Sequence, residues 1–355
     1  MKTDPVCKME IREDEAVTTD YDGEMFFFCS EGCRDVFLEG KSARKPRTIY
    51  DLIIIGGGPA GLTAAVYAST LRLNTFLIAV DLGGQAIDST KIKNYMGFDF
   101  ITGPELVGKF KYQMIHSNYI DHLMSEVEKI EPVEDGFRVT TPKRKNFFAK
   151  ALIVATGMTR RRLNVPGEEK LQRRGVFYGN IQDYSFVQGE DAAVIGGGNS
   201  ALQMVEKLQD EERRIYLVSD RKLTADPSDV ERIRGFENVK IFEEYKVEAL
   251  TGEGSLSGIR IRKKGGETTQ SFAVKGAFVA VGLHPNTYVV SKLVELNERM
   301  EITINPDCST SSPGIFAAGD VTNAFGKRII IASGEGAKAA IAAREYLLNL
   351  GKRGL

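Results

Sequence analysis

Two glycine-rich turns, each between an apolar strand-like run and a helix-like run, constrain this chain more than any other feature of its sequence. The first, Gly56-Gly-Gly-Pro-Ala-Gly61, follows the apolar run 49–55. The second, Gly196-Gly-Gly-Asn-Ser-Ala201, follows the run 192–195 and starts 140 residues later. A strand, a tight glycine turn and a helix, in that order, open a unit that binds a dinucleotide. The sequence therefore predicts an α/β fold with two such units.

Each position of these turns has a physical task. The first glycine makes the tight turn, the second lets the backbone approach a pyrophosphate, and the third position, Gly61 or Ala201, allows the helix to pack closely on the strand. The N-terminus of the helix offers unpaired N–H groups and a positive dipole to phosphates. Glycine-rich turns in an α/β fold without any ligand remain the alternative.

An acidic residue at the end of the second strand of each unit is expected to bind ribose hydroxyls. In the second unit this residue is Asp220, and the two cationic residues that follow it leave a 2′-phosphate possible on charge alone. In the first unit Asp81 is one residue out of register with Asp220. If Asp81 is a loop residue, Ala79 or Val80 occupies the ribose position instead.

The composition and charge bound the class of protein. The 355 residues suggest two or three domains. The 47 basic and 48 acidic residues nearly cancel, which argues against a general nucleic-acid binder. No apolar run is long enough to span a membrane, and the N-terminus turns acidic where a signal peptide needs an apolar core. We therefore predict a cytoplasmic protein.

Residues 1–40 are predicted to form a separate small unit. Three of the four cysteines, Cys7, Cys29 and Cys33, lie there, and only Cys308 lies elsewhere. The polar stretch 41–47 is predicted to be a linker. So short a unit buries little core and usually needs a metal or a docking surface. We expect its core to be separate, so that residues 48–355 fold without it.

From residue 48 to about residue 350 the chain resembles the low-molecular-weight thioredoxin reductase family of flavoproteins. Beside the two turns, the resemblance is carried by Gly83-Gly-Gln85, Asn94-Tyr-Met-Gly-Phe98, Ala155-Thr-Gly157, Val281-Gly-Leu-His-Pro-Asn-Thr287 and Pro313-Gly-Ile-Phe-Ala-Ala-Gly-Asp320. It implies FAD on the first unit and a nicotinamide nucleotide on the second. It also implies a homodimer, and an FAD domain (48–161 and 285–355) interrupted by an inserted NAD(P) domain (162–284).

The resemblance also implies which residues hold the cofactors. At FAD it places Gly56, Gly58, Pro59, Ala60, Gly61, Gly84, Gln85, Asn94, Thr156, Gly157, Gly319, Asp320, Arg328 and Ile329. At the nicotinamide nucleotide it places Gly196, Gly198, Asn199, Ser200, Ala201, Asp220, Arg221 and Gly282. Asp320 is expected to hydrogen-bond the ribityl chain, and the backbone after Arg328 to reach the flavin pyrimidine edge.

The chain departs from this family at the redox-active Cys-x-x-Cys-Asp motif. The matching segment is Tyr178-Gly-Asn-Ile-Gln-Asp183, in which Gly179 and Gln182 replace the cysteines and Asp183 is retained. No Cys-x-x-Cys occurs anywhere in the chain. We therefore expect no thioredoxin reductase activity. Asp183 and Tyr178 are the candidate catalytic residues, with Tyr178 either stacking near the isoalloxazine or simply packing.

A second departure concerns the choice of nicotinamide nucleotide. Of the basic cluster that selects NADPH in the family, only Arg221 has a match here. Asp220 would accept hydrogen bonds from a 2′-hydroxyl and repel a 2′-phosphate. This pattern favours NADH over NADPH.

The N-terminal unit resembles a YHS (TRASH-like) domain, on the segments Asp4–Met9, Tyr21–Cys33 and Arg34–Phe37. Its three thiolates suit a soft metal such as Zn²⁺ or Cu⁺. The unit contains no histidine, so a fourth ligand must be a carboxylate, water or another part of the chain. Two alternatives stay open. The cysteines are only packing residues, or Cys29 and Cys33 form a redox pair that substitutes for the missing dithiol.

Taken together, the sequence predicts an FAD-dependent oxidoreductase that passes hydride from NAD(P)H to flavin and then reduces an external acceptor without an internal disulfide. Candidate acceptors are a quinone, an oxidised metal ion, an electron-transfer protein or a small disulfide. The alternative is a flavin- or metal-state sensor, or a ferredoxin-fed flavoprotein. Of the histidines, His116 and His122 are expected to be solvated on one polar helix, and His284 to pack at the domain junction or lie near the flavin.

Overall fold

The computed structural model describes residues 2–6, 9–21, 24–38, 49–89, 91–117, 119–142, 145–178, 187, 189–209 and 213–353. It divides into two compact units. Unit 1 comprises Met1–Met158 and Pro285–Leu355, and unit 2 comprises Thr159–His284. The sequence placed the two crossings of the chain after residues 161 and 284. The chain leaves unit 1 through β11 (Met158–Arg160) and returns through β20 (Leu283–Pro285).

Unit 1 is built on a seven-stranded sheet with the order β7-β6-β5-β10-β9-β8, and β21 also pairs with β10. Its strands are β5 (Ile49–Ile55), β6 (Thr75–Ala79), β7 (Ile120–Met124), β8 (Lys129–Val133), β9 (Gly136–Thr141), β10 (Lys145–Val154) and β21 (Ile315–Ala317). The pairs that involve β8 or β9 are antiparallel and the others are parallel. The sequence correctly predicted the bounds of β5, because its apolar run ends directly at a glycine.

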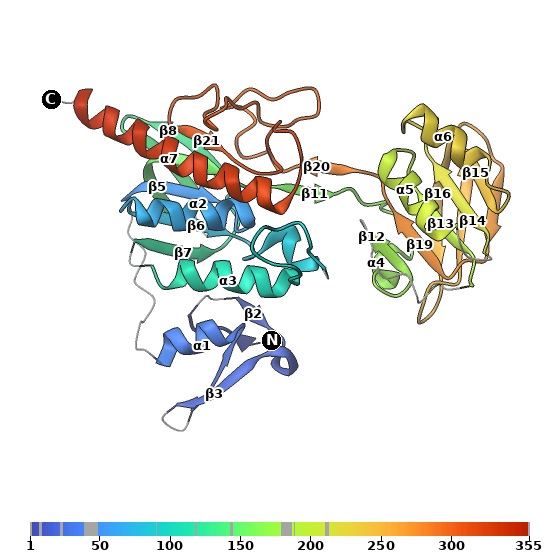
Figure 1. Cartoon of the computed structure of the whole chain (residues 1–355), viewed down its shortest axis with the longest axis horizontal. Helices are drawn as coiled ribbons and strands as arrows, with labels where there is room; N and C mark the ends of the chain where they lie inside the picture. Colours follow the sequence, from blue (N-terminus) through green and yellow to red (C-terminus); the bar gives the residue numbers. More distant parts are fainter. Residues whose placement is uncertain are drawn as a thin grey trace. The chain divides into compact units, whose positions relative to one another are not determined.

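Successive residues of β5 point to opposite faces of this sheet, as the pleat requires. Leu52 and Ile54 face a core that includes residues of the helices α2 (Pro59–Thr70), α3 (Gly103–Ile115) and α7 (Ile329–Arg353). Ile53 and Ile55 face a second core, which β9 and the segment 287–302 help to close. Figure 1 shows α7 and α2 running side by side over the sheet.

Unit 2 is built on a five-stranded parallel sheet with the order β12-β19-β13-β14-β15. Its strands are β12 (Val176–Tyr178), β13 (Ala192–Ile195), β14 (Ile215–Ser219), β15 (Val239–Glu243) and β19 (Gly276–Val279). Its helices are α4 (Glu168–Leu171), α5 (Asn199–Leu208) and α6 (Pro227–Arg234). The antiparallel strands β16 (Tyr245–Thr251), β17 (Gly258–Lys263) and β18 (Thr269–Phe272) form a second sheet.

The N-terminal module, residues 2–38, lies beside α3 of unit 1 (Figure 1). It consists of β1 (Lys2–Thr3), β2 (Glu10–Ile11), a short 3₁₀ helix η1 (Glu13–Glu15), β3 (Val17–Tyr21), β4 (Glu24–Phe28) and α1 (Glu31–Leu38). Nζ of Lys111 on α3 lies 3.5 Å from Sδ of Met9. A Cβ atom at Gly32 would lie 3.3 Å from the ring of Tyr112, so α1 and α3 are in close contact.

The expectation of a separate core for this module was wrong. Phe28 and Cys33 are fully buried, and they belong to the same apolar cluster as Met114 of α3 and Leu62 of α2. The sequence hides this because residues about 80 positions apart give no local pattern when they pack together. The module is therefore part of unit 1 and is not tethered only by its linker.

Two further expectations about elements need correction. His116 follows the last residue of α3, and His122 lies in β7, where it pairs with Leu77 of β6. Both histidines are half-buried, so the prediction that they lie solvated on one polar helix was wrong. A strand pairing formed with a distant segment overrode the local pattern.

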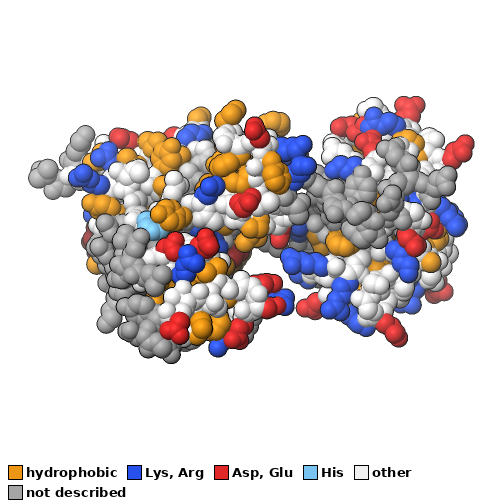
Figure 2. All heavy atoms as spheres, turned by 60° about the horizontal axis from the view of Figure 1, so that its bottom comes forward, with side chains coloured by type: hydrophobic (Ala, Val, Ile, Leu, Met, Phe, Trp, Pro, Cys, Tyr) orange, Lys and Arg blue, Asp and Glu red, His pale blue; other side chains and the backbone are white. Residues whose placement is uncertain are grey.

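Surface charge and helix hydropathy complete the description. On the face shown in Figure 2, acidic and basic side chains are interspersed, as expected for nearly equal numbers of each. Among the described residues, none of the helices combines the length and the hydropathy that crossing a bilayer requires.

The core that the module shares with α2 and α3 leads to a prediction about stability. Phe28→Ala should lower the free energy of unfolding by roughly 3–5 kcal/mol, because it leaves a cavity in a continuous core. It should also speed hydrogen exchange in α3 as well as in the module. Met25→Ala, on the same strand but 51% exposed, is the control and should change stability by no more than about 0.5 kcal/mol. Faster exchange confined to residues 2–38 would contradict a shared core.

Candidate functional site

The first glycine turn brings β5 and α2 into backbone contact. A Cβ atom at Gly61 would lie 1.9 Å from the carbonyl oxygen of Gly56, and one at Gly56 would lie 2.2 Å from that of Ala155. No side chain fits at either position. A Cβ atom at Gly58, by contrast, would meet nothing within 4 Å. The turn is therefore closed on the side of the sheet and open on the side of Gly58.

The N-terminus of α2 faces this open side. Gly58 is its N-cap residue and Pro59 its first residue, and no side chain caps the helix. The N–H groups of the first turn and the positive end of the helix dipole are thus available to a ligand. This arrangement fits the pyrophosphate of a dinucleotide.

Three other segments of unit 1 converge on the same turn. A Cβ atom at Gly84 would lie 3.2 Å from Cα of Gly58. Nε2 of the Gln85 side chain donates to the Met158 carbonyl at 2.7 Å. Thr156 and Asn286 exchange two hydrogen bonds, of 2.7 and 2.9 Å. The structure therefore brings Gly84, Gln85 and Thr156 together as predicted cofactor neighbours, and it leaves open space above Gly157.

Asp81 is a loop residue. Strand β6 ends at Ala79, and the Asp81 carboxylate accepts a hydrogen bond from the Gly84 N–H at 2.7 Å. Its carboxylate thus stabilises the turn that brings Gly84 next to Gly58. The structure thus confirms that Asp81 is a loop residue, and the placement of a ribose at Ala79 or Val80 stays a prediction.

The segment around Gly319 completes the first site. A Cβ atom at Gly319, which has a φ of +81°, would lie 2.9 Å from Cβ of Ala60. The Gly319 N–H donates to the buried carboxylate of Glu335 at 2.7 Å. Burial raises the pKa of Asp320, although the charges of Lys327 and Arg328 oppose this. Glu335 was missed by the sequence analysis, and its only signal was a carboxylate in a helix of small apolar residues.

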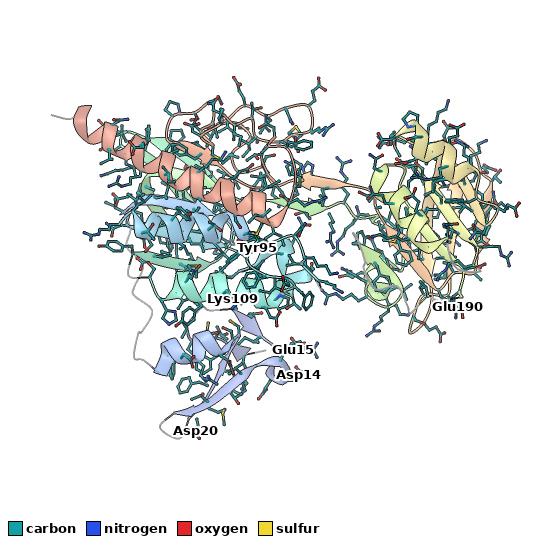
Figure 3. All side chains as sticks on the ribbon, in the orientation of Figure 1. Asp14, Glu15, Asp20, Tyr95, Lys109 and Glu190 are labelled. Carbon is teal, nitrogen blue, oxygen red and sulfur yellow. The ribbon has the colours of Figure 1, made fainter. Side chains whose placement is uncertain are left out.

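The loop that carries Asn94 lies beside the start of α7. Asn94 is exposed, and the neighbouring Tyr95 packs against Phe98, with ring centroids 6.3 Å apart. Both aromatic residues contact a small apolar cluster that also includes Ile329. Figure 3 shows Tyr95 in this loop and Lys109 on α3. The contacts hold the loop near Ile329, but no contact places Asn94 at Gly58.

The second glycine turn repeats this geometry in unit 2. A Cβ atom at Gly196 would lie 2.3 Å from the Ala280 carbonyl oxygen, and 3.3 Å from Cβ of Ala201. At Gly198, the N-cap of α5, a Cβ atom would meet only the Thr224 hydroxyl at 3.9 Å, and no side chain caps the helix. Asn199 exchanges hydrogen bonds with Asp226, of 2.9 and 3.0 Å. Its amide is therefore engaged by a loop and stabilises the rim of the turn.

Asp220 directly follows the last residue of β14, at the carboxyl end of the sheet. Arg221 Nε lies 3.2 Å from one carboxylate oxygen, and Lys264 Nζ lies 3.4 Å from the other. Partial burial raises the pKa of Asp220, but the hydrogen bond from Arg221 and the two cationic charges outweigh this and lower it. Lys264 follows β17 and was missed, because it is 44 residues away in sequence.

The predicted catalytic residues are only partly described. Tyr178 packs against the core of unit 2, its hydroxyl donates to the buried Glu168, and its carbonyl accepts from Arg160 at 2.9 Å. A role of Tyr178 at a flavin remains a prediction. Gly179, Gln182 and Asp183 lie outside the described residues. His284 is exposed, and it is the last residue of unit 2.

In the N-terminal module, the structure brings Asp4, Cys29 and Cys33 together. One potential ligand atom from each lies within 4.8 Å of the others. Asp4 is fully buried, and its carboxylate accepts from the N–H groups of Val6 at 2.7 Å and Cys29 at 2.8 Å. Asp4 is thus a candidate for the carboxylate ligand that the sequence left unidentified. Cys7 lies outside the described residues.

Comparisons with known proteins cover both parts of the chain. Residues 50–345 match the family model described as pyridine nucleotide-disulphide oxidoreductase, and residues 2–41 match the YHS domain. The chain is 36% identical over 301 residues to alkyl hydroperoxide reductase F of Staphylococcus epidermidis, covering 84% of this chain and 59% of that protein. The protein of the same name from Staphylococcus aureus is also 36% identical, over 302 residues, with the same coverage. The chain thus spans about three fifths of the length of these relatives.

A solved structure matches over its whole length. The thioredoxin reductase from Streptococcus pyogenes has a TM-score of 0.69 and 34% sequence identity, and the match covers 86% of this chain and 100% of that one. The thioredoxin reductase from Giardia duodenalis also has a TM-score of 0.69, at 28% identity, and the match covers 85% of this chain and 100% of that one. Both matches support the two-unit architecture.

A substitution at Gly58 tests whether the open space beside the first turn binds a dinucleotide. Gly58→Val should fold normally, since its φ of −73° suits any residue and nothing lies within 4 Å. It should nevertheless lose dinucleotide binding, because the side chain enters the space of the pyrophosphate. Absorbance of the purified protein and titration with FAD measure this loss. Gly61→Val is the contrasting variant, and it should fail to fold. A Gly58→Val protein that takes up FAD normally would refute the assignment.

Proposed function

The chain belongs to the pyridine nucleotide-disulphide oxidoreductase family, and we propose that it is an FAD-dependent NAD(P)H oxidoreductase that reduces an external acceptor without an internal disulfide. The observation that carries the proposal is the pair of glycine turns. Both are closed by backbone contacts on the sheet side and both present an uncapped helix N-terminus to open space. The homodimer implied by the resemblance is part of this proposal.

FAD would bind in unit 1. The N–H groups at the start of α2 would hold the pyrophosphate, and Gly84, Gln85 and Thr156 border the same space. Asp320, with Gly319 held by Glu335, would contact the ribityl chain, and the backbone at Ile329 the pyrimidine edge. When bound, FAD would supply the hydride and electron chemistry, while the protein binds and orients the reactants.

A nicotinamide nucleotide would bind in unit 2. The N–H groups at the start of α5 would hold its pyrophosphate, and Gly282 leaves open space after β19. Asp220 is held ionised by Arg221 and Lys264, and an ionised carboxylate accepts hydrogen bonds from both ribose hydroxyls. This supports NADH as the preferred donor.

An external acceptor follows from the cysteine count. The chain has four cysteines and no Cys-x-x-Cys, and Gly179 and Gln182 occupy the positions of the family's dithiol. Residues 48–355, which we call the body, contain only one cysteine, Cys308. Electrons that enter the body therefore find no dithiol there through which to leave. The acceptor is therefore a small molecule or a redox protein that reacts at the flavin site directly.

Anaerobic rapid mixing with NADH and with NADPH tests this function. We expect NADH to bleach the flavin absorbance rapidly, and an acceptor screen on the reduced protein to identify what reoxidises it. If neither nucleotide bleaches the flavin, the proposal fails. That result would favour a sensor or a flavoprotein fed by ferredoxin.

Asp220→Ser should shift the preference toward NADPH. Losing hydrogen bonds to a charged acceptor costs about 1.5–3 kcal/mol, which corresponds to a roughly ten- to hundredfold fall in kcat/KM for NADH. Arg221 and Lys264, freed from the carboxylate, can then meet a 2′-phosphate. Lys222, the second of the two cationic residues that follow Asp220 in sequence, was expected to share this task with Arg221, and Lys264 is an additional cation beside the carboxylate.

A double variant provides the control for this prediction. Adding Lys264→Gln to Asp220→Ser should remove the gain with NADPH, whereas adding Lys222→Gln should leave it. Steady-state kinetics with both nucleotides give the answer. Better use of NADPH than of NADH by the unaltered protein would contradict the role of Asp220.

We also propose that the N-terminal module binds one soft divalent or monovalent cation. Cys29 and Cys33 offer sulfur ligands and Asp4 offers an oxygen, and all three are held within 4.8 Å by the fold. Cys7, three residues after Asp4 in sequence, is the expected fourth ligand. Three thiolates suit Zn²⁺ or Cu⁺, and the carboxylate favours Zn²⁺ of the two.

Metal analysis with Zn²⁺ tests this assignment. The full chain should bind one Zn²⁺, Cys29→Ser should abolish binding, and Asp4→Asn should weaken it at least about tenfold, because even outer-shell partners of a metal contribute that much. Asp20→Asn, an exposed acid of the same module, is the matched control and should bind normally (Figure 3). Equal zinc affinity of the two Asp variants would remove Asp4 from the ligand set.

A further inference from the structure

Cys33 of α1 and Cys29, two residues before the start of that helix, lie in direct contact. Their Sγ atoms are 3.6 Å apart, which is van der Waals distance for two sulfur atoms that are not bonded. Cys29 is half-buried and Cys33 is fully buried. A disulfide needs an S–S distance of about 2.05 Å. The two sulfurs must therefore come about 1.5 Å closer for a bond to form.

The backbone around both cysteines is held by hydrogen bonds. The N–H of Cys29 donates to the Asp4 carboxylate at 2.8 Å, and the N–H of Cys33 donates to the Ser30 hydroxyl at 3.3 Å. These bonds fix the start of α1 against the loop that carries Asp4. The two backbone segments that carry the sulfurs are therefore held next to each other.

We propose that Cys29 and Cys33 form a peroxide-sensitive dithiol, whose oxidation to an intramolecular disulfide releases the metal of the module. The formation of the disulfide does not depend on the proposed function. The release of metal rests on the proposed site, because a disulfide removes two of its thiolate ligands. The module then joins metal binding and peroxide sensing at one pair of sulfurs.

The chemistry balances with a hydroperoxide as the oxidant. The Cys29 sulfur attacks one peroxide oxygen, the O–O bond breaks, and Cys29 becomes a sulfenic acid while water (or an alcohol) leaves. The Cys33 sulfur then attacks the Cys29 sulfur, the S–O bond breaks, and a second water leaves. The proton of that water comes from the Cys33 thiol in the metal-free pair and from solvent in the metal-bound pair. In total the two sulfurs lose two electrons, and these electrons reduce one peroxide. Exposure assigns the order, since a solvent peroxide reaches half-buried Cys29 before buried Cys33.

Cys308 is an internal control for this reaction. It is fully buried, and its Sγ lies 3.6 Å from the Glu335 carbonyl oxygen. Burial raises the pKa of its thiol to about 11, so little thiolate is present at neutral pH. Cys308 should stay reduced under conditions that oxidise the pair.

The experiment uses the full chain loaded with Zn²⁺ and titrated with hydrogen peroxide. We expect intact mass to fall by two hydrogen atoms, peptide mapping to link Cys29 to Cys33, and one Zn²⁺ to appear on a chromogenic chelator. A thiol reductant should restore zinc binding. In Cys33→Ser the sulfenic acid should persist on Cys29 and be trapped by dimedone. In Cys29→Ser neither the linkage nor the trapped product should form.

Other outcomes would overturn the proposal. These are a link from Cys7 to either cysteine, a disulfide between chains, or an unreactive pair after zinc has been removed by a chelator. NADH bleaching of the flavin, measured on the same sample, keeps this test separate from the proposed function. If the Cys29–Cys33 disulfide forms in a chain that binds no zinc, the dithiol stands, and the metal release and metal site fail.

Discussion

Backbone packed directly against backbone at Gly61 is the constraint on which the rest of unit 1 depends. This glycine lets α2 touch the carbonyl of Gly56 at the end of β5, and Gly336 lets α7 touch the carbonyl of Ala60 in the same way. One strand and two helices thereby meet at a single point. Their meeting fixes an uncapped helix N-terminus beside open space. In unit 2 the helix position is Ala201, and the contact of Gly196 with the Ala280 carbonyl corresponds to that of Gly56 with Ala155. The proposed dinucleotide sites follow from these contacts, because the close packing at Gly61 places the uncapped N-terminus at Gly58 beside open space.

How far the sequence could predict this structure depended on whether a signal was local. The bounds of β5 and β13 could be read directly, since each is an apolar run that ends at a glycine. The position of Asp220 after β14 was also predictable from the spacing of the motif. His122 was misplaced because its strand forms only by pairing with β6. Lys264 and Glu335 could not be found, because neither belongs to a motif. Each contacts a residue that is distant in sequence, Asp220 for Lys264 and Gly319 for Glu335. The shared core of Phe28 and Met114 was hidden for the same reason.

The cysteines are distributed unevenly between the N-terminal module and the rest of the chain. The body keeps a single cysteine, Cys308, which burial makes unreactive, while the family's dithiol positions hold Gly179 and Gln182. Thiol chemistry is thereby confined to the module, where Cys29 and Cys33 lie in contact beside Asp4. The module is packed on α3, the helix that follows the Asn94 loop, through Gly32 and Met9. The module therefore contacts the helix that directly follows the Asn94 loop.

The central claim is that electrons enter the body from a nicotinamide nucleotide and meet no internal disulfide there. A stoichiometric anaerobic titration of the zinc-loaded full chain with NADH tests it most directly, because zinc keeps the module's thiolates from serving as an electron store. The account predicts that one equivalent of NADH per FAD completes the bleaching and that further NADH reduces nothing more. A requirement for two equivalents per FAD would reveal a second two-electron acceptor in the chain and would contradict the account, as would an absence of bleaching.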